Sequence, residues 1–186
     1  ERGRFQFENI AKLLEQKVHE TVLEVNLNAI SENFHYYKTQ LRKDTKVMVM
    51  VKAFSYGNGS YEIAHHLEYH KADYLAVAYV DEGIALRKKG IRTPIMVLNP
   101  DGSQFKQLIE HGLEPEIYSF RQLVTLSQEL KKANIKSFPV HLKLDTGMRR
   151  LGFESSQVDE LSKWLANHNE ISVSSVFSHL ASTNSF

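Results

Sequence analysis

The regular alternation of short apolar runs with helix-like segments constrains the fold of this chain more than any other feature of its sequence. Short apolar runs bounded by turn residues predict buried strands, because such runs have no polar face to expose to water. The predicted strands are Val47–Val51, Tyr74–Tyr79, Ile95–Leu98, Glu116–Tyr118, Val140–Leu144 and Ser172–His179. The helices between them are predicted to begin near Ser60, Asp81, Ser103, Ser119 and Ser156. Repeated strand–helix units predict an α/β fold with a parallel sheet and right-handed crossovers.

Two segments that precede this series have a different pattern. Phe7–Val18 carries apolar residues at helical spacing and is predicted to be an amphipathic helix. Thr21–Leu27 alternates apolar with polar residues and predicts a strand. Asn28 then caps a predicted helix with apolar positions Ile30, Phe34, Tyr37 and Leu41. Because one helix separates this strand from the main series, we expect it to belong to a different sheet.

The composition excludes several classes of protein. The chain has 186 residues, of which 42% are hydrophobic and 24% are charged, as is typical of a globular protein with a sizeable core. A net charge of +1 gives no electrostatic reason to expect nucleic acid or a membrane surface as a partner. There is no cysteine, so disulfides and thiolate metal sites are excluded. No apolar run has the length of a membrane span and the N-terminus lacks a signal-peptide core, so we expect a cytoplasmic protein.

Lys52 is the first residue with a chemical signal. It directly follows the strand Val47–Val51, so it is expected at the carboxyl edge of the sheet, where α/β folds bind their ligands. An amine desolvated there can lose its proton and attack a carbonyl carbon. A solvated lysine at the end of a strand is the more common alternative, and Lys52 alone does not decide between them.

The fifth predicted strand carries the second signal. His141, Lys143 and Asp145 fall at alternate positions and share one face of the strand. In a barrel this polar row points inward, where its groups must be paired or used; on an edge strand it faces water. The pattern favours both interpretations equally. The following turn contains Arg149 and Arg150, whose guanidinium groups can form bidentate bonds to anions, although adjacent loop arginines are usually solvated.

Histidines provide the third signal. His179 ends the last predicted strand, where it can stack on a flat ring, transfer a proton or simply be a core residue. His65, His66 and His70 do not form a convincing metal cluster, because only His66 and His70 have helical spacing and no third ligand is evident. We therefore predict no metal site.

Three segments together resemble the alanine racemases, whose N-terminal domain is a pyridoxal-phosphate-binding (β/α)8 barrel. They are Val51–Gly59, Leu144–Phe153 and Ser178–Ala181, and they occur in the order and at the separations typical of the family. The resemblance implies a TIM-type barrel truncated after about six strands, since the fold has eight. It covers residues 21–186, a partial barrel domain. Residues 1–20 are expected to be a connector helix or linker, because Ile10–Glu20 resembles the connector of bifunctional proteins in which a cell-wall peptide ligase precedes the racemase.

The resemblance also implies a role for each matching residue. Lys52 matches the lysine that binds pyridoxal phosphate covalently and later acts as a catalytic base. Tyr56 matches the tyrosine that contacts the cofactor phosphate. Arg150 matches an arginine that binds the cofactor and assists with substrate, and His179 matches the histidine that packs on the pyridine ring. Lys143 matches a lysine that is carbamylated in several members. Because two buried cations repel, we expect Lys143 to be carbamylated or compensated by a bound anion.

The implied activity of the full-length protein is that of an isomerase, which interconverts L-alanine and D-alanine for peptidoglycan precursors. A homodimer is expected, because the second catalytic base of the family is a tyrosine from the other subunit. Three positions depart from the family pattern: Phe54 replaces a usual Asn, Asn58 a common His, and Arg149 a common Gly. They flank the cofactor and bear on affinity or loop conformation.

Two other classes of function remain open on the sequence. One is a non-enzymatic pyridoxal-phosphate-binding barrel that carries the cofactor, although such proteins generally lack the Asp145–Gly152 signature. The other is an inactive structural fragment, because an open barrel exposes strand edges and apolar surface. In either case we expect the 186-residue chain alone to have no racemase activity.

Overall fold

The computed structural model describes residues 23–181 of the chain and contains one parallel sheet of six strands in the order β1-β2-β3-β4-β5-β6. The strands are β1 (Met48–Met50), β2 (Tyr74–Val77), β3 (Ile95–Val97), β4 (Glu114–Ile117), β5 (Phe138–Leu144) and β6 (Ile171–Ser178). Each strand is parallel to the one before it. The predicted α/β fold with helical crossovers is therefore confirmed.

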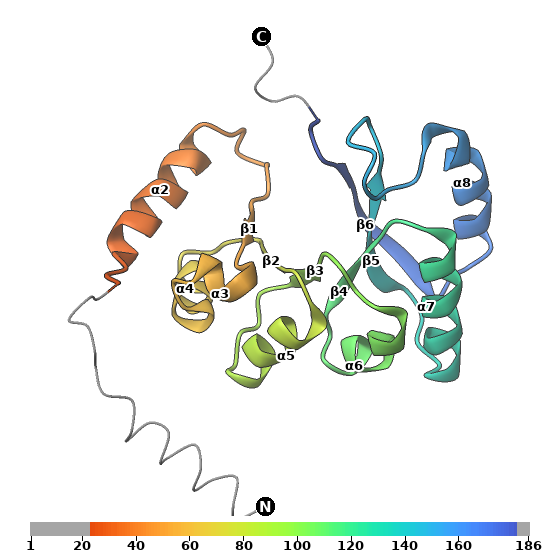
Figure 1. Cartoon of the computed structure of the whole chain (residues 1–186), viewed down its shortest axis with the longest axis horizontal. Coiled ribbons are helices and arrows are strands. Elements are labelled where there is room, and N and C mark those ends of the chain that lie inside the picture. Colours follow the sequence, from red (N-terminus) through yellow and green to blue (C-terminus); the bar gives the residue numbers. More distant parts are fainter. Residues whose placement is uncertain (1–22, 182–186) are drawn as a thin grey trace, which may run out of the picture.

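The crossover helices cover one side of the curved sheet, as Figure 1 shows. In chain order the helical elements are α2 (Leu27–Thr39), α3 (Lys52–Tyr56), α4 (Ser60–Tyr69), α5 (Val80–Lys88), η1 (Gly102–Gln104), α6 (Phe105–Glu110), α7 (Phe120–Lys132), η2 (Ser155–Gln157) and α8 (Val158–Ala166). Their apolar faces and the strand residues that meet them form one continuous core, in which Leu75, Ile95, Phe105 and Leu123 are fully buried. In the described part of the chain, no helix is long and apolar enough to cross a membrane.

The N-terminal expectations are partly wrong. Leu23–Asn26 is not a strand, and Leu27 already belongs to α2. The cap of α2 is Asn26, not Asn28, because the Asn26 Oδ1 accepts a hydrogen bond from the Ala29 amide at 3.1 Å. An alternating segment becomes a strand only when another strand pairs with it, and none does so among the described residues. The predicted helix Phe7–Val18 lies outside the described residues.

Smaller corrections concern where elements begin. Strand β4 begins at Glu114, two residues before the predicted start, and pairs with β3 through Glu114 and Pro115. Helix α4 begins at Ser60 itself, so its cap position is Gly59. The cap position of α5 is Tyr79, not Asp81. These shifts of one or two residues leave the predicted topology unchanged.

Helix α2 meets α4 through a group of aromatic rings. The His35 ring of α2 lies 5.1 Å from the His70 ring, and His70 lies 4.5 Å from His66 of α4. The Phe34 side chain of α2 is buried in the core. Three imidazoles are thereby concentrated at the contact between the two helices.

Candidate active site

The carboxyl edge of the sheet surrounds a cavity of about 570 Å³, a size typical of small-molecule sites. All six strands or the loops that follow them contribute to its lining, which consists of Met48, Met50, Lys52, Ala78, Tyr79, Met96, Leu98, Asn99, Glu116, Lys143, Arg150, Leu151, Ser175, Phe177, Ser178 and His179. Four of the predicted site residues, Lys52, Lys143, Arg150 and His179, are therefore brought together. Tyr56 is not among the lining residues, and its side chain is 64% exposed.

Lys52 begins a turn with an unusual backbone. Ala53, Phe54 and Ser55 have φ values of 51–52° and Tyr56 has 58°, so four consecutive non-glycine residues adopt the left-handed helical conformation. Each such residue costs about 1–2 kcal/mol relative to the right-handed helix. The surrounding structure must hold this segment in place, as is common at functional sites. The turn separates the Lys52 amine, at the cavity, from the exposed Phe54 and Tyr56 side chains.

Glu82 of α5 fixes this turn. One of its carboxylate oxygens, Oε1, accepts a hydrogen bond from the Ala53 amide at 2.7 Å. The other, Oε2, accepts from the amides of Ala78 and Tyr79 at 2.8 and 3.2 Å. One side chain thus joins the residue after Lys52 to the end of β2. Glu82 has no distinctive signal in the sequence, because an acidic residue in a first helical turn is too common to indicate this role.

The inward-facing row of β5 is buried, which decides between the two interpretations of this strand in favour of the barrel. Lys143 is 7% exposed, and its Nζ lies 2.8 Å from Oε1 of Glu116, which is fully buried on β4. The Lys143 Nζ also lies 5.6 Å from the centroid of the Phe177 ring. Burial raises the pKa of the Glu116 carboxyl above its ordinary value, although Lys143, Arg150 and His141 act in the opposite direction. The positive charge of Lys143 can thus be compensated by a carboxylate of the chain itself. Glu116 is also a residue of the site that had not been predicted from the sequence.

A second polar layer lies deeper in the sheet. His141 places Nδ1 2.7 Å from the Ser175 hydroxyl and Nε2 3.0 Å from Oε2 of Glu114. The Tyr74 hydroxyl donates to the same Glu114 oxygen at 3.3 Å. Burial, followed by the nearby Glu114 charge, raises the pKa of Tyr74. This layer satisfies its polar groups internally and supports the strands that carry Glu116 and Lys143.

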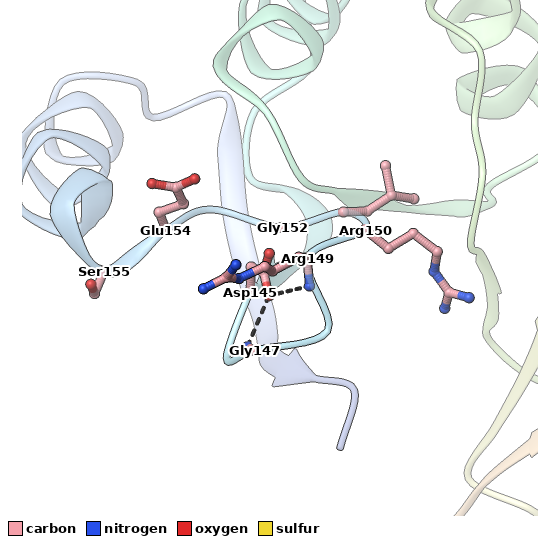
Figure 2. A pocket seen from close by; sticks show the side chains of 8 residues that line it. Asp145, Gly147, Arg149, Arg150, Gly152, Glu154 and Ser155 are labelled. Atoms are coloured by element: carbon pink, nitrogen blue, oxygen red, sulfur yellow. Dashed lines mark hydrogen bonds between the residues drawn. The ribbon is translucent and has the colours of Figure 1, made fainter. Parts of the chain in front are cut away.

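The loop after β5 carries the two arginines and has a fixed conformation (Figure 2). Oδ1 of Asp145 accepts hydrogen bonds from the amides of Gly147 at 2.9 Å and Arg149 at 3.0 Å, and these bonds lower the pKa of Asp145. At Gly152, a Cβ atom would lie 2.4 Å from the Asp145 nitrogen, so only glycine fits. Figure 2 shows the Arg149 and Arg150 side chains pointing in opposite directions, and only Arg150 lines the cavity with Lys52.

The charges around the cavity favour an anionic ligand. Its lining contains three cationic side chains, Lys52, Lys143 and Arg150, and one carboxylate, Glu116. The aromatic side chains of Tyr79 and Phe177 and the imidazole of His179 add flat surfaces. An amine that can attack a carbonyl, a guanidinium that can bind an oxyanion and flat walls suit a planar, anionic aldehyde.

Comparison with known proteins gives a consistent result. Residues 25–185 match the family described as alanine racemase, N-terminal domain. Alanine racemase 1 of Caldanaerobacter subterraneus subsp. tengcongensis is 35% identical over 168 residues, which is 88% of this chain and 42% of that protein. An amino-acid racemase of Enterococcus faecalis is 36% identical over 165 residues, which is 88% of this chain and 22% of that protein.

Solved structures show the same fold. An alanine racemase from Clostridium difficile 630 in complex with cycloserine has a TM-score of 0.80 and 34% identity, over 85% of this chain and 44% of that chain. This likeness confirms the predicted TIM-type barrel, of which the six strands form a curved part. The chain thus spans less than half the length of these relatives.

Proposed function

The chain belongs to the family of the alanine racemase N-terminal domain, and from this premise we propose that it is part of a pyridoxal-phosphate-dependent enzyme that interconverts L-alanine and D-alanine. One observation carries the proposal: the Lys52 amine, the Arg150 guanidinium and the His179 imidazole line one cavity at the carboxyl edge of the sheet. In a barrel of this type, that edge is where catalytic groups gather.

The lining of the cavity fits the proposed cofactor. Pyridoxal phosphate is a flat, anionic aldehyde, and the cavity offers an amine, an excess of positive charge and aromatic walls. When bound, the cofactor accepts the electron pair left behind as the α-proton of an amino acid departs. We propose that Lys52 holds the cofactor and exchanges this proton on one face of the substrate. Arg150 binds an anionic oxygen, and His179 packs against the ring.

Several finer points are part of the same proposal. We assign Tyr56 to the cofactor phosphate, which its exposed hydroxyl on the turn after Lys52 permits. The second base is proposed to come from another subunit of a homodimer, and the D-alanine to supply peptidoglycan precursors. Three further points stay predictions: a connector in residues 1–20, a partial barrel domain in residues 21–186, and a cytoplasmic location.

The test uses the full-length protein and two lysines that flank strand β1. Incubation with each alanine enantiomer and pyridoxal phosphate, followed by chiral chromatography, should show interconversion. Borohydride reduction and peptide mapping should place the cofactor on Lys52. Lys52→Ala should abolish both the label and turnover, because the attachment point and one base disappear together. Lys46→Ala is the matched control, because Lys46 is exposed just before β1, at the opposite end of the strand from Lys52. Lys46→Ala should keep both the cofactor label on Lys52 and the turnover of alanine.

Other outcomes would point to the other classes of function. Cofactor on Lys52 without turnover of alanine or any other amino acid would indicate a cofactor carrier. Cofactor on a different lysine, or on none, would overturn the assignment of the site. The broader name of the Enterococcus faecalis relative, an amino-acid racemase, is the reason to include other amino acids in the assay.

A further inference from the structure

Glu116 has an unusual environment for a carboxylate. It is fully buried on β4, and the Lys143 Nζ at 2.8 Å from Oε1 is a close ion pair without the alignment of a hydrogen bond. The second oxygen, Oε2, has no hydrogen-bond partner among residues 23–181. A buried carboxylate oxygen without a hydrogen-bond donor is unfavourable, so its position calls for a functional reason.

Arg150 is the donor that fits this oxygen. It lines the same cavity as Glu116 and Lys143, and its positive charge lowers the pKa of Glu116 against the effect of burial. Among the described residues, Arg150 makes no hydrogen bond or ion pair of its own, whereas Asp145 fixes the backbone of its loop. A guanidinium with free donors and a carboxylate with a free acceptor therefore face one cavity.

Resting on the proposed function, we propose that Glu116 is the residue that positions Arg150 for catalysis. Its Oε2 accepts an N–H of the Arg150 guanidinium, while Lys143 balances the remaining charge as an unmodified ammonium. A charge-assisted bond of this kind fixes the orientation of the planar guanidinium as well as its distance. Glu116 acts through Arg150 and needs no contact with the substrate.

The same arrangement opposes carbamylation of Lys143. Carbamylation would convert the cationic end of Lys143 into an anion and so break its ion pair with Glu116, whose Oε1 lies 2.8 Å from the Lys143 Nζ. A carbamate would also place a second negative charge beside a buried carboxylate, where like charges repel strongly. The Glu116 carboxylate thus already provides the negative charge that a carbamate on Lys143 would provide at this site.

The experiment compares the two glutamates of β4, the buried Glu116 and the partly buried Glu114, in the full-length holoenzyme. Glu116→Gln removes the charge beside Arg150, and Glu114→Gln makes the same change in the deeper layer, where Glu114 meets His141. We expect Glu116→Gln to lower kcat by about 100-fold, the scale of a misplaced catalytic group, with the cofactor still on Lys52. Glu114→Gln should keep kcat. Added formate should restore part of the activity of Glu116→Ala, because a small carboxylate can occupy the space left by the side chain.

Two further measurements do not depend on turnover. Wild-type protein equilibrated with ¹³C-labelled bicarbonate should show no carbamate resonance on lysine. Phenylglyoxal should modify Arg150 faster in Glu116→Gln than in the wild type, as read by peptide mapping. A carbamate on Lys143, equal kcat in the two glutamine variants, or unchanged Arg150 reactivity would overturn the proposal. If the wild type does not racemise alanine, the proposed function fails, and these two measurements still test the positioning of Arg150.

Discussion

At the scale of residues, the ion pair between Glu116 and Lys143 joins two neighbouring strands inside the site. Glu116 is 27 positions before Lys143, so only the parallel register of β4 and β5 brings them together.

The buried ion pair makes a prediction about stability. Lys143→Met leaves Glu116 buried without its partner and should destabilise the full-length protein by about 3 kcal/mol, whereas the double variant Glu116→Gln/Lys143→Met should recover most of the loss. The folded-state pKa of Glu116 is raised, so its contribution to stability is present below its ordinary pKa and is lost as the pH rises. Lys143 opposes the rise in the Glu116 pKa, so Lys143→Met raises this pKa further and its deficit in stability should grow from pH 5 to pH 8. Denaturant unfolding of the variants measures both effects.

An exposed pair provides the control for this cycle. Lys106 and Glu110 lie 4.0 Å apart on α6 with mostly exposed side chains, so Lys106→Met should change stability by less than about 0.5 kcal/mol. An equally small effect of Lys143→Met would show that its pair with Glu116 contributes no more than a surface ion pair.

The sequence predicts those residues of the candidate site that lie in recognisable segments. Lys52, Arg150 and His179 each end or follow a predicted strand, and they line one cavity. Glu116 and Glu82 could not be predicted in this way, because a single carboxylate has no local pattern and its partner lies far along the chain.

At the scale of elements, periodicity predicted every strand of the sheet and failed where tertiary structure decides. Thr21–Leu27 has the alternation of a strand, but Leu23–Asn26 has no pairing partner among the described residues and α2 begins at Leu27. The left-handed turn after Lys52 was also missed. Ala53, Phe54 and Ser55 do not favour that conformation by themselves, and the glycines at 57 and 59 indicate only that some turn is present.

The contact between α2 and α4 should loosen in acid. Burial, and then the charges of His66 and His35, lower the pKa of His70 in the folded state. A base with a lowered pKa gives stability that is present above its ordinary pKa, about 6.5, and is lost as the pH falls through the folded value. Hydrogen exchange of Leu27–Thr39, corrected for the intrinsic rate, should therefore be less protected at pH 5.5 than at pH 7.5.

Replacing the histidine separates this effect from general acid unfolding. His70→Asn should reduce the pH dependence of α2, and His111→Asn, on the C-terminal side of α6, should leave it unchanged. Protection of α2 that does not change between these pH values in the wild type would mean that His70 does not govern the contact.

At the scale of the whole molecule, the sheet has two outer strands. Within the described residues, β1 and β6 each pair on one side only, so water can reach the cavity from both ends of the sheet. We expect the 186-residue chain alone to be inert toward both alanine enantiomers, because Lys52 is the only base it is proposed to supply and the site is not enclosed. Chiral chromatography of reactions with added pyridoxal phosphate measures this directly.

A chimera tests whether closure of the site is what the chain lacks. Joining this chain to the unmatched C-terminal part of the Caldanaerobacter subterraneus relative should restore interconversion of the alanine enantiomers. Racemisation by the 186-residue chain alone would contradict the expectation and make Tyr56 and His179 the first candidates for the second base.

The consecutive order of the strands also affects how the protein reaches its folded state. Each strand pairs with the strand before it in the chain, so each pairing in the sheet spans a single strand–helix unit. Such a pairing closes a shorter loop than a pairing between strands further apart in the chain, so less chain entropy is lost before it forms. This strand order allows the sheet to grow one strand–helix unit at a time. Inner strands such as β3 and β4 have neighbours on both sides and should be the last to open.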